Sequence, residues 1–282
     1  MAQVSHRSSS IRSGRSPNMR NPYQQLVELY RNRGAFSSIG SWLLEPASRV
    51  IARAKVGKGV SVEVRSTRLG VVYCRLGDSD FRTMFEIHRG EYDICLGRPD
   101  ILSILDLGAN VGMSVRLWQK EYPKAKIVAF EPSPSSFRLL ARTIAAGPAP
   151  DMVCAIEAAV TLSGSTVMLD VSGDSDSNHV GSSGIRVAGV SLEHAIDRAA
   201  GHPGGSVDLI KMDIEGSELE LLAEAKTWLK RTRFLLVEVH QGVAQSEVIG
   251  MMQSACPKIR VQPVREAGQV ATYWCEVLAS SA

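Results

Sequence analysis

The sequence predicts an α/β fold, a Rossmann-like, doubly wound and mostly parallel sheet with helices on both faces. From Ile101 onward, near-continuous apolar segments alternate with long helical segments, as expected for parallel strands that are buried on both faces. Acidic residues stand at or near the ends of five predicted strands, at Asp106, Glu131, Glu157, Asp213 and Glu238. Ligands of such sheets bind beyond the carboxyl ends of the strands, so these residues mark the expected site.

Each strand is expected where a branched or apolar run is bounded by turn residues. The expected strands cover 61–76 (one or two strands), 101–108, 126–132, 152–160, 166–171, 207–216, 234–240 and 272–280. Each helix is expected where apolar residues recur at helical spacing, as at Phe81 and Met84. The expected helices cover 23–34, 80–94, 113–122, 135–147, 190–200 and 217–231. The strand over 166–171 and the Ser- and Gly-rich run 172–184 are expected to form a hairpin and a loop. Ser217 with Glu220 is expected to form a capping box.

The composition is that of an ordinary soluble globular protein, with 44% hydrophobic and 22% charged residues in 282. A net charge of +3 is too small to indicate nucleic-acid binding. No apolar run is long enough to span a bilayer. The five cysteines are scattered, with no CxxC pair, which favours a reducing compartment and thus a cytoplasmic location.

The N-terminal segment differs in composition from the rest of the chain. It carries four arginines and no acidic residue before Glu28. Residues 1–22 are expected to form a disordered basic tail, although an Arg- and Ser-rich, acid-poor segment also fits an organelle transit peptide. Residues 23–98 are expected to form a helical and extended N-terminal extension.

The turn over residues 106–112, Asp-Leu-Gly-Ala-Asn-Val-Gly, indicates the ligand. It has two glycines, where a dinucleotide fold uses G-x-G-x-x-G, and no Gly-Lys-Ser/Thr follows it. A carboxylate at Asp106 would repel a pyrophosphate and attract an ammonium group. S-adenosylmethionine carries an ammonium and a sulfonium but no phosphate, and Glu131 is placed to accept hydrogen bonds from its ribose hydroxyls. An ordinary strand-to-helix turn is the alternative interpretation.

Four segments, ILDLGANVG, FEPSPSSFRLL, LIKMDIEGSELELL and LLVEVH, resemble the FkbM family of S-adenosylmethionine-dependent methyltransferases. The resemblance covers about residues 76–240. It implies a seven-stranded class I methyltransferase sheet in a domain over 99–282, and O-methylation of a hydroxyl on a sugar, glycan or secondary metabolite. Thr143 and Glu193 depart from the family's usual Asn and Asp.

Two groups of residues are expected to bind the cofactor. The turn and strand-end residues are Asp106, Gly108, Ala109, Asn110, Gly112, Glu131, Glu157 and Ala158. The resemblance adds Ser79 and Asp80, which would close over the methionine end of the cofactor. A helix cap is the alternative role for these two residues.

The chemistry is expected at the ends of the later strands. Lys211, Asp213 and Glu215 alternate and should share a face, with Asp213 as the base or cofactor-orienting group and Lys211 tuning it. Glu238 and His240 also alternate. His240 is a candidate general base, with a hydrogen-bonded structural role as the alternative. Asp213, Glu215, Glu238 and His240 could together bind a divalent metal, although none is expected.

The sequence therefore predicts a cytoplasmic O-methyltransferase that acts on a small-molecule or glycan hydroxyl and binds no nucleic acid. One alternative is an S-adenosylmethionine-binding module that has lost turnover. The other is an NAD(P)-dependent oxidoreductase, which the missing third glycine disfavours.

Overall fold

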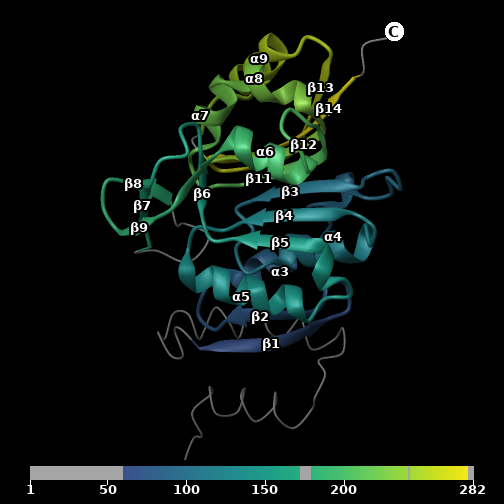
Figure 1. The fold of residues 1–282 in the computed structure, drawn as a ribbon, viewed down its shortest axis with the longest axis vertical. Coiled ribbons are helices and arrows are strands. Elements are labelled where there is room, and N and C mark those ends of the chain that lie inside the picture. Colours follow the sequence, from purple (N-terminus) through teal and green to yellow (C-terminus); the bar gives the residue numbers. More distant parts are fainter. Residues whose placement is uncertain (1–59, 172–178, 241, 279–282) are drawn as a thin grey trace, which may run out of the picture. The chain divides into compact units, whose positions relative to one another are not determined.

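The computed structural model describes residues 60–171, 179–240 and 242–278, and all of these fall within one compact unit. The expected tail over 1–22 and helix over 23–34 lie outside the described residues. A seven-stranded sheet forms the centre of the fold (Figure 1). Its strands, in spatial order, are β13 (Ile259–Ala267), β14 (Val270–Val277), β12 (Thr232–Val239), β11 (Val207–Met212), β3 (Ser103–Leu107), β4 (Lys126–Phe130) and β5 (Val153–Ile156).

Six of these strands share one direction, and β14 runs antiparallel between β12 and β13. The predicted mostly parallel, seven-stranded sheet is thus confirmed. The chain runs outward from β3 to β4 and β5, and then returns to place β11 on the other side of β3. The order therefore reverses between β3 and β11, where an open parallel sheet leaves a crevice at its carboxyl edge.

Helices cover both faces of the sheet. They are α3 (Asp80–His88), α4 (Met113–Glu121), α5 (Pro134–Ala145), α6 (Leu192–Ala200), α7 (Glu218–Ala223), α8 (Ala225–Trp228) and α9 (Gln245–Ala255). Short 3-10 turns occur at η1 (Asp93–Cys95), η2 (Pro150–Met152) and η4 (Leu229–Arg231). Pro134 opens α5, where the missing N–H costs nothing. The Ser191 hydroxyl caps α6 by accepting from the N–H of His194.

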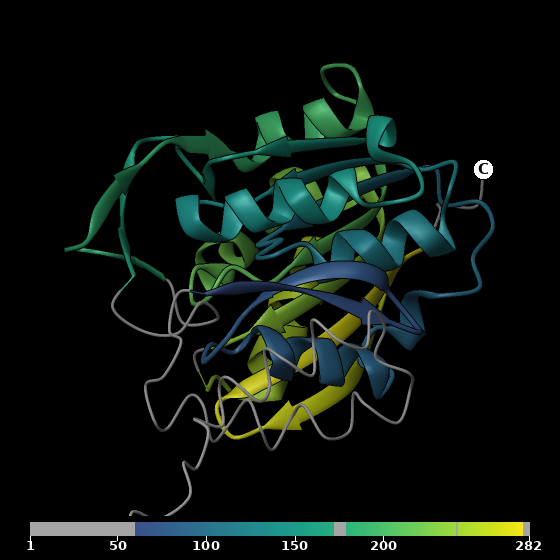
Figure 2. The ribbon, with the colours of Figure 1, turned by 90° about the horizontal axis from the view of Figure 1, so that it is seen from below.

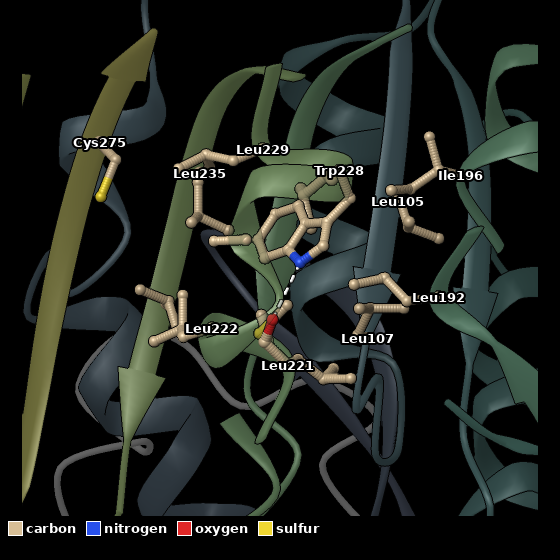
Figure 3. Close-up of a cluster of buried hydrophobic side chains, with 14 of the residues drawn as sticks. Leu105, Leu107, Leu192, Ile196, Leu221, Leu222, Trp228, Leu229, Leu235 and Cys275 are labelled. Carbon is tan, nitrogen blue, oxygen red and sulfur yellow. Dashed lines mark hydrogen bonds between the residues drawn. The ribbon is translucent and has the colours of Figure 1, made fainter. Parts of the chain in front are cut away.

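A large core cluster lies between the sheet and helices α6 to α9 (Figure 3). Leu105 and Leu107 of β3 and Leu235 of β12 pack there around Trp228, and all four are buried. The indole Nε1 of Trp228 donates to the carbonyl of Leu221 at 2.9 Å. Because side chains alternate along a strand, Asp106 points to the opposite face, toward α4.

Three smaller sheets flank the core. They are the hairpin of β1 (Ser61–Ser66) and β2 (Gly70–Arg75), the parallel pair β6 (Ala159–Thr161) and β10 (Gly189–Ser191), and the antiparallel sheet of β7 (Val167–Asp170), β8 (His179–Gly181) and β9 (Ile185–Val187). The β1–β2 hairpin lies along α4 and α5 (Figure 2). It is held by a bond from the Tyr73 N–H to the Thr143 hydroxyl and one from Arg116 Nε to the Leu69 carbonyl.

Several expected boundaries are wrong. The single strand over 152–160 is divided into β5 and β6, and the single helix over 217–231 into α7, α8 and η4. The expected hairpin after 166–171 is confirmed, because β8 pairs antiparallel with β7, while residues 172–178 lie outside the described residues. The capping box is also wrong, because Ser217 precedes α7 without a side-chain cap. Helix α9 and strand β13 were not predicted.

Candidate active site

A cavity opens at the carboxyl ends of β3, β4 and β11. Its polar wall includes Thr83, Asn110, Ser114, Glu131, Lys211, Asp213, Glu215 and Ser217. Its apolar wall includes Ile87, Tyr92, Val111, Met113, Phe130, Pro132, Ala158, Val160, Leu169 and Val180. The cavity therefore lies at the topological switch point and joins an apolar pocket to converging carboxylates, as small-molecule sites commonly do.

Gly108 lets the turn after β3 pack directly on the chain that leaves β11. Its φ is +77°, and a Cβ at this position would lie 1.7 Å from the carbonyl oxygen of Asp213. The Nζ of Lys211 donates to the Gly108 carbonyl at 2.7 Å. The turn and the end of β11 are therefore fitted to each other, and only glycine is compatible with this approach.

Glu131 is held rigidly at the end of β4. Its Oε1 accepts from the N–H of Ser133 and its Oε2 from the N–H of Asn110, both at 2.8 Å. Burial raises the pKa of Glu131 to about 7, against the lowering effect of these two hydrogen bonds. Each carboxylate oxygen has a second lone pair, so Glu131 can still accept hydrogen bonds from a ligand's hydroxyl groups.

Lys211 lies between the carboxylates of Asp106 on β3 and Asp213 just after β11. Its buried Nζ lies 3.5 Å from Asp106 Oδ1 and 3.2 Å from Asp213 Oδ2. Burial alone would lower the pKa of this amine, but the charges of Asp213 and Asp106 outweigh it and raise the pKa well above its usual range. Lys211 is therefore a permanent cation that holds Asp213 at the cavity wall.

His240 follows β12 and is surrounded by carboxylates. Its Nδ1 lies 3.1 Å from Glu218 Oε1, and its Nε2 lies 3.3 Å from Glu215 and 3.4 Å from Glu238. Burial lowers the pKa of His240, but the bonds to Glu218 and Glu238 and the charges of Asp213 and Glu215 raise it to about 11. The ring is thus an imidazolium at neutral pH and has no lone pair with which to accept a proton. This argues against the expected general-base role.

Glu215 has an unusual backbone and an unusual environment. Its φ is +54°, a conformation that few non-glycine residues adopt, and its side chain lines the cavity. Burial and the charge of Asp213 raise the pKa of Glu215 to about 8. It is therefore, with Glu131, one of two cavity carboxyl groups whose pKa is raised toward neutral pH.

The fully buried Glu218 fixes the segment between β11 and α7. It accepts from the N–H groups of Ile214 and Gly216 and pairs with His240. Asp213, Glu218 and His240 offer ligand atoms that all lie within 4.8 Å of one another. The four residues considered as a possible metal set, Asp213, Glu215, Glu238 and His240, also lie together here, because Glu215 and Glu238 both contact the His240 Nε2. The imidazolium already supplies a positive charge at the centre of this group.

Of the residues expected at the cofactor, Gly108, Ala109, Asn110, Glu131 and Ala158 line the cavity, as do Lys211 and Asp213. Ser79, Asp80, Asp106, Gly112, Glu157, Glu238 and His240 are not among its lining residues. Ser79 precedes α3 and Asp80 is paired with Arg75, while Gly112 starts α4 against α5. The Glu157 side chain is exposed just after β5.

Asp106 has a different partner from the one expected. The residue is fully buried and accepts from the indole Nε1 of Trp118 at 3.0 Å. The ammonium group beside it is that of Lys211. In this structure Asp106 therefore anchors Lys211 and the turn from behind the cavity wall, and does not contact the cavity itself.

Sequence reasoning did not assign several cavity residues. Thr83, Ile87 and Tyr92 come from α3 and the segment after it, before the first strand of the large sheet. Tyr92 stacks on Trp118 with ring centroids 5.8 Å apart. Ile87 belongs to the apolar spacing of the expected helix, which also fits an ordinary core-facing helix. The family resemblance covers all three positions but assigned them no role.

Comparison with known proteins places this site in a family. A model of the methyltransferase FkbM domain matches residues 106–258, which is more than half of the chain. The chain belongs to the FkbM methyltransferase family. The match begins at Asp106 and includes Glu131 and Asp213, the two strand-end carboxylates that line the cavity. Membership agrees with the resemblance that the sequence motifs indicated.

Three methyltransferases have sequences similar to this member of the FkbM family. Methyltransferase sdnD from Sordaria araneosa is 30% identical over 165 residues, covering 46% of this chain and 62%, less than two thirds, of that protein. Hexuronic acid methyltransferase AglP from Haloferax volcanii is 26% identical over 177 residues, covering 59% of this chain and 70% of that one. The 2-O-methyltransferase NoeI from Sinorhizobium fredii is 30% identical over 171 residues, covering 54% and 68%.

Among solved structures, an FkbM methyltransferase from Methylobacillus flagellatus is similar, with a TM-score of 0.45 and 15% identity. The similarity covers 82% of this chain and 58% of that one. Among the described residues, no helix of this FkbM chain combines the length and apolar character needed to cross a membrane.

Proposed function

We propose that this FkbM-family chain is an S-adenosylmethionine-dependent O-methyltransferase acting on a hydroxyl of a sugar, glycan or secondary metabolite. The observation that carries the proposal is the pairing of two strand-end carboxylates, Glu131 and Asp213, on one cavity across the Gly108 turn. Glu131 is suited to accept hydrogen bonds from the ribose hydroxyls, and Asp213 is suited to accept the proton of the reacting hydroxyl. Both belong to the segment that matches the family model.

The cavity fits the cofactor. Glu131 would hold the ribose hydroxyls, and the turn residues Gly108 and Ala109 line the cavity beside it. Phe130 at the end of β4 and Ala158 just beyond the end of β5 offer an apolar surface for the adenine. When bound, S-adenosylmethionine supplies an electrophilic methyl group on a sulfonium.

The protein's own contribution would be to orient the acceptor hydroxyl and remove its proton. Positioning accounts for much of such catalysis. Asp213 is the proposed proton acceptor, since its carboxylate lines the cavity and is held by Lys211 at 3.2 Å. His240 is proposed to act as a fixed cation behind it, 3.7 Å from Asp213, with Glu238 as a partner of the imidazolium.

The acceptor class rests on the relatives. AglP is named for a hexuronic acid, which is a sugar derivative, and NoeI for transfer to a 2-O position. Taken together, the two names support an acceptor of the sugar class and transfer to oxygen. The β7–β9 sheet borders the cavity through Leu169 and Val180, which makes it the proposed acceptor side. A sugar presents hydroxyl groups to carboxylates and C–H faces to apolar side chains, and the cavity as a whole is lined by both kinds of residue.

Calorimetry with S-adenosylhomocysteine tests the proposal. The full chain is expected to bind S-adenosylhomocysteine, and to transfer a labelled methyl group from S-adenosylmethionine to members of a panel of neutral sugars and hexuronic acids. Tight binding of NAD or NADP with none of S-adenosylhomocysteine would overturn the proposal in favour of an oxidoreductase. Binding with no transfer to any hydroxyl would favour a module without turnover.

Glu131→Gln is expected to weaken binding of S-adenosylhomocysteine roughly 10- to 100-fold in calorimetry, because a charged acceptor for the ribose hydroxyls is replaced by a neutral amide. Glu157→Gln is the matched control, as it removes the charge of an exposed glutamate at the end of the neighbouring strand. Equal losses in the two variants would contradict a specific ribose contact at Glu131.

Chelation is expected to leave methyl transfer unchanged. His240 already places a positive charge among Asp213, Glu215, Glu218 and Glu238, so a cation of the protein itself occupies the position that a divalent metal would take. The measurement is the initial rate after dialysis against EDTA, compared with untreated enzyme. A loss of rate that Mg²⁺ or Mn²⁺ restores would instead show a metal site in this group of carboxylates.

A further inference from the structure

Arg75 reaches the cofactor turn from β2, outside the segment that matches the family model. Its Nη2 donates to the side-chain oxygen of Asn110 at 3.1 Å. Asn110 has a φ of +47°, in the left-handed region. A residue other than glycine stays there only where its surroundings hold it. The contact from Arg75 is one such constraint.

The conformation of Asn110 matters because of what its backbone does. In this conformation the Asn110 N–H donates to Glu131 Oε2 at 2.8 Å. Both residues line the cavity. Because α4 begins at Met113, a different φ at Asn110 would have to be compensated by rotation of the Ala109–Asn110 peptide, which carries this N–H. That rotation would leave the Glu131 carboxylate without one of its two backbone donors. The bond from Arg75 therefore acts on Glu131 through the turn.

Arg75 is itself held in a fixed position. It is 8% exposed, and its Nε and Nη2 donate to the two oxygens of Asp80 at 2.9 and 2.8 Å. The backbone N–H of Arg75 also donates to Asp80, which is fully buried. A planar guanidinium can bind one carboxylate in this forked way and still use an N–H on a further acceptor, which a lysine cannot do. The paired hydrogen bonds to Asp80 thus direct the remaining Nη2 N–H of Arg75 toward Asn110.

We infer that Arg75 is a positioning residue for cofactor binding, which holds Asn110 in the left-handed conformation that places its N–H on Glu131. This inference rests on the proposed S-adenosylmethionine site. It also gives the β1–β2 hairpin a role in the site, although Arg75 does not line the cavity. Variants of Arg75 should therefore change cofactor affinity and leave the chemical step unaffected.

A double-mutant cycle tests the inference, with Arg75→Lys, Asn110→Gly and both changes together. Lysine keeps a positive charge for Asp80, and glycine adopts the left-handed region without a side-chain acceptor. Each single change is expected to weaken S-adenosylhomocysteine binding roughly tenfold, with the double variant no weaker than the singles. The KM for S-adenosylmethionine should rise, and kcat at saturating cofactor should stay the same. Additive losses, or a fall confined to kcat, would overturn the inference.

Two further variants keep the test decisive. Arg116→Lys weakens the docking of the hairpin at Leu69 without touching Asn110, so an equal loss of affinity there would assign the effect to the hairpin as a whole. Arg75→Met with Asp80→Leu replaces the buried ion pair by apolar side chains, if Arg75→Lys fails to fold. This variant should also lose roughly tenfold in affinity, and unchanged affinity would overturn the inference. Absence of binding by the wild-type chain would instead overturn the proposed function.

Discussion

Replacing Asp213 with Asn is expected to lower kcat for methyl transfer by roughly 10²- to 10⁴-fold, while S-adenosylhomocysteine still binds. The amide oxygen of Asn can accept from Lys211 as the carboxylate does at 3.2 Å, so the cavity wall keeps its shape. The amide cannot take a proton from the acceptor hydroxyl. The measurement is the transfer rate of labelled methyl at saturating cofactor, with whichever member of the sugar and uronic acid panel the wild-type chain methylates.

Glu215→Gln is the matched control for this prediction, because Glu215 lines the same cavity and also contacts His240. Its pKa is raised to about 8, so much of it is protonated at neutral pH and cannot accept a proton. If Glu215 were the base, kcat would rise with pH through about 8 as the carboxyl group ionises. A large loss in Glu215→Gln with full activity in Asp213→Asn would transfer the role to Glu215.

The sequence was sufficient to predict the parts of the site that depend on strand order. Apolar strands alternating with helices determine a parallel sheet, and its carboxyl edge must bring the strand ends together. The positions of Glu131 and Asp213 at two such strand ends were therefore enough to predict that they share one cavity with the two-glycine turn. Their distance in the chain was no obstacle, because the sheet topology joins them.

Other features of the site depend on side-chain packing, which no local sequence pattern predicts. The side of β3 on which Asp106 lies decides whether its carboxylate faces the cavity or contacts Lys211. Its hydrogen bond from Trp118 shows which side this is, and that bond is visible only in the three-dimensional structure. His240 looked like a candidate base because its spacing from Glu238 was visible. The Glu218 carboxylate, which helps to make the ring a cation, lies on α7 and was hidden in an apparently ordinary helix start.

The segments at the edge of the fold were the least predictable. Strand β13 is largely exposed and contains Pro263 and a register shift, which obscure the alternation expected of a strand. The breaks between α7, α8 and η4 interrupt an apolar pattern that continues through them, since Leu221, Leu222, Trp228 and Leu229 all face the core. Packing against β12 and α9 therefore determines where the helices end.

Gly108→Ala is expected to lower the free energy of unfolding by at least about 3 kcal/mol and to abolish binding of S-adenosylhomocysteine. The new Cβ would lie 1.7 Å from the Asp213 carbonyl oxygen. Backbone atoms cannot move aside as a flexible side chain can, so the turn after β3 and the end of β11 must separate. That movement would also break the 2.7 Å bond from Lys211 to the Gly108 carbonyl. Urea unfolding and calorimetry measure the two losses.

Gly204→Ala separates the contact from backbone strain. Gly204 has a φ of +72°, close to the +77° of Gly108, but a Cβ there would meet no atom within 4 Å. The strain of a left-handed alanine alone is about 1–2 kcal/mol, so Gly204→Ala should lose that much stability and keep cofactor binding. Equal losses of stability in the two variants would show that strain, and not the approach to Asp213, requires glycine at 108. A larger loss at 108, together with lost binding, would show that the contact between the turn and β11 holds the cavity in shape.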